Sequence, residues 1–511
     1  MAEALTSSYK KLMEKTKDVI ILQTALQMIN WDMETKMPPK GIKLRSEQIA
    51  MLSRIRHKMS TDPEIGKLLE EILHHPKYEG LDALQKRNLH LIKKDYDEQT
   101  KLPEDLVATL AKQQAIATDI WKKAKAAKDF AMFKPELEKL VELEKKVAEI
   151  FMKVKETATP YDALIDIYEP KMPSKAISKV FDELREGLVS ILKKCESSPK
   201  QPDTSILNRK VPIDVQRKIA KALADFVGYE VESKTAGGRI DETEHPFTTG
   251  FYDDVRITTH YFEDYFASSM FSILHETGHA LYEQNLKQDW MYQPIGTGCS
   301  MGFHESQSRF VENMVGRSHE FLTYFLPKLK ALTGNVMSDI KLDAFGHAVN
   351  QVKPSKIRVE ADEVTYGLHI IIRFNLERDL FADKITVKEL PELWNQSYKD
   401  YLGLKIEHDS EGVMQDTHWA SGYFGYFPSY ALGNIYSGQL LAAMQKELPN
   451  WRSQISKGNF AEVKSWLVRN VHSQGNLYDP PELIRKIAGQ ELTVKPYLNY
   501  LKEKYARLYG F

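Results

Sequence analysis

The residues with the clearest chemical potential are His275-Glu276-Thr277-Gly278-His279. On a helix, positions four apart lie on one face, about one turn apart, so both imidazoles can reach one metal ion. Glu276 then stands beside the remaining coordination position. This spacing is the H-E-x-x-H zinc-hydrolase signature. The alternative is an amphipathic core helix with two hydrogen-bonded histidines, but burying three polar groups in so short a segment is costly without a metal or partners.

A third protein ligand is expected from a later helix, because a catalytic zinc commonly has two histidines, one glutamate and a water. The segment 303–313 has a helical pattern, and Glu305 in it is the predicted ligand. Glu312 is the rival ligand, and Glu305 could instead be a solvated carboxylate near a helix N-terminus. Arg309 occupies the position where many such enzymes place a carboxylate that orients a ligand histidine. That carboxylate must come from elsewhere, and the sequence does not identify it.

The segment from Thr417 to Gln445 has no Asp, Glu, Lys or Arg. Its glycines, proline and amides make it too polar and too interrupted for a membrane span, so a buried wall is expected. Within it, His418, Tyr423 and Tyr430 are candidate donors to the oxyanion of a tetrahedral intermediate. A packed aromatic core is the alternative interpretation of each tyrosine.

The composition excludes several classes of protein. The 511 residues contain 70 Lys and Arg against 71 Asp and Glu, a net charge of −1 that argues against a nucleic-acid binder with a basic face. The only cysteines are Cys195 and Cys299, which excludes a disulfide framework and fits a reducing, cytoplasmic compartment. Charged residues precede the first apolar run, which is the wrong order for a secretory signal. Cys299 is interpreted as a packed thiol, since nothing near it in the sequence resembles the base of a nucleophile.

The elements that position these residues are mostly helices. Helical patterns dominate from about Ser7 to Thr157 and again beyond Asp264. The alternation in 254–261, after His245–Phe251, predicts one small antiparallel β-sheet beside the H-E-x-x-H helix. A linker-like stretch near 197–203 suggests an N-terminal helical region, 1–198, and a catalytic region, 199–511, in one continuous body.

Together with the zinc helix, five further segments resemble the M32 metallocarboxypeptidases over essentially the whole chain. They are His245-Pro-Phe247, Asp254-Val-Arg-Ile-Thr258, His304-Glu-Ser-Gln307, Ile357-Arg-Val-Glu-Ala-Asp362 and Gly412-Val-Met-Gln-Asp-Thr-His-Trp419.

This resemblance implies a mainly α, zincin-like fold with a long, deep groove that the N-terminal helices partly roof. It implies zinc (Zn²⁺) bound by His275, His279 and Glu305, one ion per chain, with cobalt (Co²⁺) as a possible substitute. Glu276 is implied as the general base. The resemblance further implies a homodimer that releases single amino acids from peptides with a free C-terminal carboxylate.

A carboxypeptidase must hold a terminal carboxylate, which a planar guanidinium does with two parallel hydrogen bonds. Arg358 is the first candidate; its alternative role is an i,i+4 ion pair with Asp362 on a helix. Arg256 is the second candidate. The strand that carries Arg256 is expected to border the groove. Either an extended peptide hydrogen-bonds to the edge of this strand, or the strand only closes one end of the groove.

The predicted reaction is attack of a metal-bound water on the last peptide carbonyl, with Glu276 as the base that removes the proton. Glu276 then returns the proton to the leaving amine. The nearest rival is a zinc endo-oligopeptidase with the same metal chemistry. An aminopeptidase is disfavoured because no Gly-x-Met-Glu-Asn type motif is present. A noncatalytic helical protein with a structural metal is the alternative from a different class.

Overall fold

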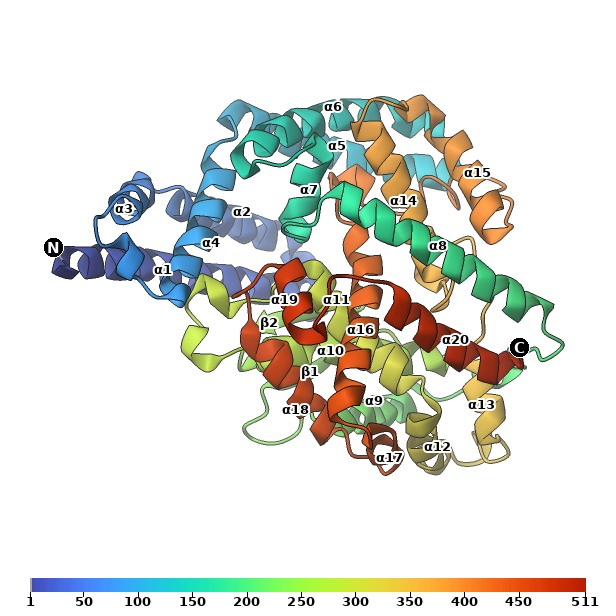
Figure 1. Cartoon of the computed structure of the whole chain (residues 1–511). Coiled ribbons are helices and arrows are strands. Elements are labelled where there is room, and N and C mark those ends of the chain that lie inside the picture. Colours follow the sequence, from blue (N-terminus) through green and yellow to red (C-terminus); the bar gives the residue numbers. More distant parts are fainter. Residues whose placement is uncertain (1) are drawn as a thin grey trace.

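Four N-terminal helices form an arm on one side of the molecule in the computed structural model, which describes residues 2–511 (Figure 1). The sequence determines where the helices start: Asp62 caps one helix ahead of Pro63, and Asp82 forms a capping box with Gln85 at the next. The apolar faces of three of these helices enclose a small core that includes Leu12, Leu69 and Leu89. The helices are α1 (Ala2–Thr35), α2 (Ile42–Ser60), α3 (Pro63–Leu73) and α4 (Ala83–Thr100).

Two segments that are distant in the sequence form the wall at the top of Figure 1. Helix α8 contacts α14, and both bury broad apolar faces. The first segment contributes α5 (Glu104–Ala127), α6 (Phe130–Lys155), α7 (Pro160–Tyr168) and α8 (Ser174–Ser197), and the second α14 (Tyr366–Phe381) and α15 (Leu390–Leu402).

The remaining helices form the lower part of the molecule in Figure 1. Helix α16 runs through its centre and is buried almost all round, as its lack of formal charge up to Gln445 predicts. A π-helical segment, Phe310–Gly316, continues directly from α11. These helices are α9 (Ile213–Val227), α10 (Phe266–Gln284), α11 (Met301–Arg309), α12 (His319–Thr333), α13 (Leu342–Ala348), α16 (Pro428–Glu447), α17 (Trp451–Ser456), α18 (Ala461–Asn470), α19 (Pro480–Ala488) and α20 (Lys495–Tyr509).

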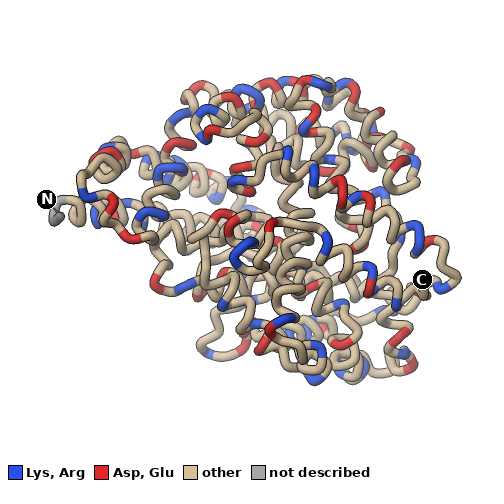
Figure 2. The backbone as a smooth tube through the Cα atoms, in the orientation of Figure 1, with Lys and Arg blue, Asp and Glu red and all other residues tan. Residues whose placement is uncertain are grey.

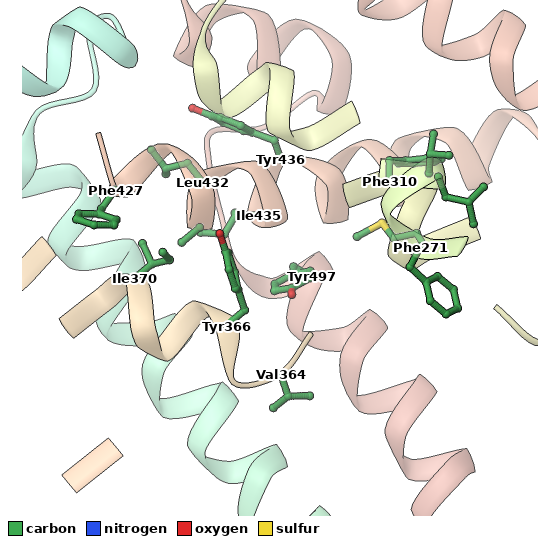
Figure 3. Packing of buried hydrophobic residues seen from close by; sticks show 14 of the residues in the cluster. Phe271, Phe310, Val364, Tyr366, Ile370, Phe427, Leu432, Ile435, Tyr436 and Tyr497 are labelled. Carbon is green, nitrogen blue, oxygen red and sulfur yellow. The ribbon is translucent and has the colours of Figure 1, made fainter. Parts of the chain in front are cut away.

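One hydrophobic core joins the wall and the lower part. It takes in buried residues from Ala117 to Tyr509. Figure 3 shows Tyr366 of α14, Ile435 of α16 and Tyr497 of α20 within this core. The mainly α fold expected from the sequence is confirmed.

The small sheet lies beside α10, as predicted, but its topology differs from the prediction. Its strands are β1 (Gly238–Glu242), β2 (Thr248–Phe251) and β3 (Asp254–Thr259), in the order β1-β3-β2. Strand β2 pairs antiparallel to β3, whereas β1 pairs parallel to it, so the sheet is mixed and not wholly antiparallel. Because β3 is the central strand, both of its edges are already paired. Edge addition of a peptide to β3, one of the two expectations for this strand, is therefore excluded.

Within residues 2–511, no helix is both long enough and apolar enough to span a bilayer. Both signs of charge are interspersed along the chain in Figure 2, in keeping with the near-zero net charge.

Glu144 on α6 gives the fold a specific pH dependence. Its side chain is buried beneath Gly422, close to Gln114, and burial raises the pKa of the carboxyl from 4.5 to about 8. Between these values the folded chain holds a proton that the unfolded chain releases, so stability falls as the pH rises from about 5 to 8. Glu144→Gln mimics the protonated carboxyl, so its free energy of unfolding is expected to fall by roughly 2 kcal/mol less than that of the wild type between pH 5 and 8. Urea unfolding at both pH values measures this fall in each protein. An equal fall in both proteins would contradict the prediction.

Candidate active site

The two histidines of the H-E-x-x-H helix face one glutamate of α11. His275 and His279 lie one turn apart on α10, and their Nε2 atoms lie 3.7 Å and 3.4 Å from Oε2 of Glu305. One ligand atom from each of the three residues fits in a group whose members all lie within 4.8 Å of one another. The structure thus brings together the three predicted ligands.

Gly278 allows α10 and α11 to approach closely enough for this arrangement. A Cβ atom at Gly278 would lie 2.5 Å from the backbone oxygen of Gln307 and 2.5 Å from Cα of Ser308. On the opposite side of α11, a Cβ at Gly433 of α16 would lie 2.7 Å from Cβ of Glu305. The glycines at both crossings therefore leave room for α11, which carries Glu305, between α10 and α16.

Gly278→Ala is expected to push α11 away from α10, with a cost of about 2 kcal/mol in stability and a weaker metal site. Thermal unfolding with and without added Zn²⁺, together with the retained metal content, measures both effects. Gly80→Ala is the matched control, because a Cβ there meets no atom within 4 Å. Equal behaviour of the two variants would contradict the proposed role of the helix crossing.

Glu305 is buried and held in place by a cation. Its Oε1 accepts a hydrogen bond from Nε of Arg309 at 2.6 Å, and its Oε2 accepts one from Ser308 Oγ at 3.1 Å. Glu305 is only 6% exposed, which excludes the alternative that it is a solvated carboxylate near a helix N-terminus. Burial alone would raise the pKa of this carboxyl, but Arg309 and the two histidines hold it well below its usual range. Glu305 is thus ionised at neutral pH.

Glu312 is the carboxylate that orients His275. Its Oε2 lies 2.9 Å from Nδ1 of His275, on the side of the ring opposite Glu305. Arg317 donates to its Oε1 at 3.1 Å, and Arg309 reaches Oε2 at 3.3 Å. Glu312 lies in the π-helical segment that follows α11, and π-helical turns often occur at functional sites. The sequence analysis did not identify the carboxylate that orients a ligand histidine. In the structure Glu312, considered there as a rival metal ligand, has this position.

His279 reaches a carboxylate indirectly. Its Nδ1 lies 2.6 Å from Nδ1 of His304, whose Nε2 lies 2.8 Å from Oε1 of Glu283. Burial lowers the pKa of His279 to about 3, so its imidazole is neutral at physiological pH. Glu283 follows His279 by one helical turn on α10, a spacing that could have drawn attention to it from the sequence.

These residues fit a divalent transition metal. Two imidazole nitrogens and one ionised carboxylate oxygen converge, and the Nδ1 atoms of both rings are engaged elsewhere, so the Nε2 atoms remain for an ion. Two nitrogens and one oxygen are the donors of many catalytic zinc sites. Each histidine also has the polar partner that orients ligand imidazoles in such sites.

Glu276 lies beside this group and is fixed by the sheet. Thr248 on β2 donates its hydroxyl to Oε2 of Glu276 at 2.6 Å and also contacts the backbone oxygen of Glu276 at 3.0 Å. Glu276 is 6% exposed, and burial raises the pKa of its carboxyl. Thr248 was not among the predicted site residues. Only the fold, which places β2 against α10, reveals its role.

Arg358 belongs to a second cluster of charged and aromatic residues. Its Nε donates to Oδ1 of Asp416 at 2.9 Å, and Arg373 donates to the other oxygen at 2.7 Å. Asp362 instead accepts hydrogen bonds from Lys353 and from its own chain neighbours, so the expected alternative of an Arg358–Asp362 pair is excluded. Two cations share one anion, which leaves an excess positive charge in a buried region.

His418 and Tyr430 lie next to this cluster. Nε2 of His418 lies 3.3 Å from the Tyr430 hydroxyl, and the Arg358 guanidinium lies 5.1 Å from the centre of the Tyr430 ring. Burial lowers the pKa of His418 to about 4, so the ring is neutral at pH 7. Its Nδ1 is buried and has no hydrogen-bond partner within the described chain.

Tyr366, which the sequence analysis did not select, and Tyr426 of the uncharged segment lie in the same region. Tyr366 accepts a hydrogen bond from Nη1 of Arg358 at 3.3 Å, and its ring lies 4.4 Å from the guanidinium of Arg309. Tyr366 therefore connects the Arg358 cluster with the arginine that holds Glu305. Tyr426 packs against Tyr430, with ring centres 5.2 Å apart. No local sequence signal marks Tyr366, which lies outside the uncharged segment.

Two predicted residues lie apart from these groups. The Tyr423 residue is 52% exposed, and its ring centre is 6.4 Å from that of Tyr426. Arg256 donates twice to Asp254, at 2.7 Å and 2.8 Å, and its guanidinium lies 4.2 Å from the ring of Trp31 on α1. Arg256 thus fastens the N-terminal arm to the sheet in this structure. Roles for both residues in the reaction stay predictions.

A cavity of about 570 Å³ lies between the N-terminal arm and the metal-ligand helices. Helices α1 and α4 line one side, and Phe251 of β2, Glu283 and His304 line the other. Cys299 also lines it, but burial raises the pKa of its thiol strongly, and Sγ lies 3.2 Å from the backbone oxygen of Tyr478. These properties agree with an inert packed thiol.

Comparisons with known proteins agree with this geometry. The family model for carboxypeptidase Taq (M32) metallopeptidases matches residues 11–505. Carboxypeptidase 1 of Bacillus subtilis is 38% identical, with 98% of each chain covered. Thermostable carboxypeptidase 1 of Thermus thermophilus is 39% identical, with 99% of each chain covered.

The solved structures include a similar protein from the same family. The M32 carboxypeptidase of Deinococcus radiodurans superposes with a TM-score of 0.94 at 33% identity, over 99% of this chain and 100% of the other. The matches extend along the whole chain and include the segments that carry the ligand residues. The chain therefore belongs to the M32 metallopeptidase family and is a metal-dependent carboxypeptidase.

Proposed function

We propose that this carboxypeptidase holds one Zn²⁺ per chain through His275, His279 and Glu305, and releases single amino acids from peptides with a free C-terminus. The observation that carries the proposal is the convergence of both Nε2 atoms on Oε2 of Glu305, with Glu276 alongside. Cobalt is proposed as a substitute, because the same nitrogen and oxygen donors suit both ions.

Glu276 is proposed as the general base. When bound, a divalent ion lowers the pKa of water toward about 7 and polarises the scissile carbonyl. Thr248 occupies Oε2 of Glu276, which leaves Oε1 to take the proton of the attacking water. Oε1 then returns this proton to the amine of the released amino acid. The hydrogen bond from Thr248 also prevents the carboxylate from rotating away.

His418 is proposed as a donor to the oxyanion. If its Nε2 accepts the hydrogen bond from Tyr430, a neutral ring carries its proton on Nδ1, the atom that lacks a partner. Because this atom is buried, a substrate oxygen would reach the donor only if binding uncovers the ring. Tyr430 and Tyr423 are proposed as further donors, with the exposed Tyr423 able to act only if it turns inward on binding.

Arg358 is proposed to hold the terminal carboxylate, since Asp416 leaves part of the charge of Arg358 and Arg373 uncompensated. Arg256 is proposed to act at the end of the groove near α1, where it stacks on Trp31. We further propose that residues 1–198 partly roof the groove and that residues 199–511 form the catalytic region. The cavity lined by α1, α4 and β2 supports this division.

Peptide digests read by mass spectrometry, paired with metal analysis, test this proposal. A free-acid peptide should lose residues one at a time from its C-terminus, and its amidated counterpart should resist. Chelation should abolish the activity, and Zn²⁺ or Co²⁺ should restore it at one equivalent per chain. Internal cleavage of amidated peptides would favour the endo-oligopeptidase, and metal without any cleavage would favour a noncatalytic binding protein.

We also propose a cytoplasmic homodimer. The location is supported by the two cysteines, which are both buried and unpaired, and the dimer by the family resemblance alone. Sedimentation equilibrium would measure the subunit number; a monomer at micromolar concentration would contradict the dimer.

A further inference from the structure

His304 lies between the ligand histidine His279 and the carboxylate of Glu283. The three side chains are joined by two contacts, with 2.6 Å between the Nδ1 atoms of the two histidines and 2.8 Å from His304 Nε2 to Glu283 Oε1. We infer that His304 is a positioning residue that links Glu283 to His279 and thereby decides which nitrogen of His279 carries its proton. The inference rests on the proposed ligand set.

The direction of each hydrogen bond follows from what each group can donate. An ionised carboxylate only accepts, so Nε2 of His304 must carry a proton. When His304 carries this single N–H, its Nδ1 is an acceptor. Nδ1 of His279 must then donate across the 2.6 Å contact, since two acceptors or two donors would repel at that distance. The lone pair of His279 is left on Nε2, the atom that faces Glu305.

The two ligand histidines are therefore oriented in different ways. His275 meets the carboxylate of Glu312 directly, at 2.9 Å, whereas His279 meets that of Glu283 through an intervening ring. His304 stays in place because its ring lies 4.8 Å from that of His279 and 5.1 Å from that of Tyr282.

The linking pair also faces the cavity beneath the N-terminal arm. His304 and Glu283 both line this cavity of about 570 Å³ between the arm and helices α10 and α11. Their side chains are 21% and 19% exposed. The orientation of His275 is instead maintained by Glu312, whose side chain is 11% exposed and held by two arginines.

Glu283→Gln is the central test, because it preserves the shape of the side chain. An amide can donate or accept, so it no longer forces a proton onto Nε2 of His304, and His279 becomes a mixture of tautomers. We expect the metal dissociation constant, measured by competition with a chromophoric chelator, to rise roughly 10–100-fold. His304→Gln should have a similar effect, and the double variant should be no worse than the more affected single variant.

Two further measurements make the test specific. In the metal-free wild type, long-range ¹H–¹⁵N NMR should show His279 protonated on Nδ1, and Glu283→Gln should add the Nε2-protonated form. His472→Gln is the matched control: its ring also lies 5.2 Å from that of Tyr282, but its Nε2 contacts Gln307, not a proposed ligand. Its metal affinity should equal that of the wild type.

The possible results separate this inference from the proposed function. If His279→Ala loses the metal but Glu283→Gln binds it like the wild type, the inference is overturned and the ligand set stands. If His279→Ala binds metal normally, the ligand set fails and the inference fails with it. If His472→Gln weakened metal binding as much as His304→Gln does, the inference would also be overturned, because a change in packing would then explain the lower metal affinity.

Discussion

Glu276→Gln is expected to lower kcat/KM by about 10²–10⁴-fold while the protein keeps one metal ion per chain. The amide preserves the size of the side chain and can still accept the hydrogen bond from Thr248. It cannot take a proton from water, so the general-base step is lost. Steady-state kinetics on a free-acid peptide, with metal content measured on the same sample, checks the prediction.

The metal content is the internal control for this variant. Retained activity would remove Glu276 from the role of base, and loss of the ion would assign it to metal binding instead. Thr248→Val keeps the carboxylate but removes the donor that fixes it. We expect a smaller loss for that variant, on the order of 10-fold, because one hydrogen bond to a charged group contributes about 1.5–3 kcal/mol at most.

Arg358→Ala is expected to lower kcat/KM toward free-acid peptides by about 10²–10³-fold, with a much smaller effect on amidated peptides. Loss of one partner from a buried charge pair costs about 2–5 kcal/mol, which sets this range. The ratio of the two activities is the measured quantity. It should fall toward one in the variant, whereas an equal loss on both substrates would argue against carboxylate recognition.

Arg373→Ala provides the matched control, because Arg373 pairs with the same Asp416 but is completely buried. Its removal should destabilise the fold and leave the preference for a free carboxylate unchanged. If both variants lost the preference equally, the excess charge of the cluster, and not the guanidinium of Arg358, would be the determinant.

The sequence predicted the residues whose relation is local. Helical periodicity alone places His275 and His279 on one face of α10, and the helical pattern around Glu305 made it the expected third ligand. Alternation predicted β3, but alternation carries no information on strand direction, so the parallel pairing of β1 was not foreseen. The uncharged segment was expected to form a buried wall, and much of it forms the buried helix α16.

The interactions that the sequence could not predict join elements distant in the chain. Thr248 reaches Glu276 from a strand, and Asp416 pairs with Arg358 across 58 positions. Glu312 was considered as a ligand because a carboxylate near a metal site can bind either the ion or the ring that binds it. Only the positions of His275 Nδ1 and Arg317 distinguish the two roles.

The arginines beside the proposed ligands bear on how the protein can exchange a metal ion. Glu305 and Glu312 carry two negative charges, and Arg309 and Arg317 supply two positive charges in direct contact with them. Withdrawal of a cation therefore leaves neither Glu305 nor Glu312 without a positively charged partner in the interior. A chelated sample should keep its folded shape, and one ion should replace another without any need to refold the chain.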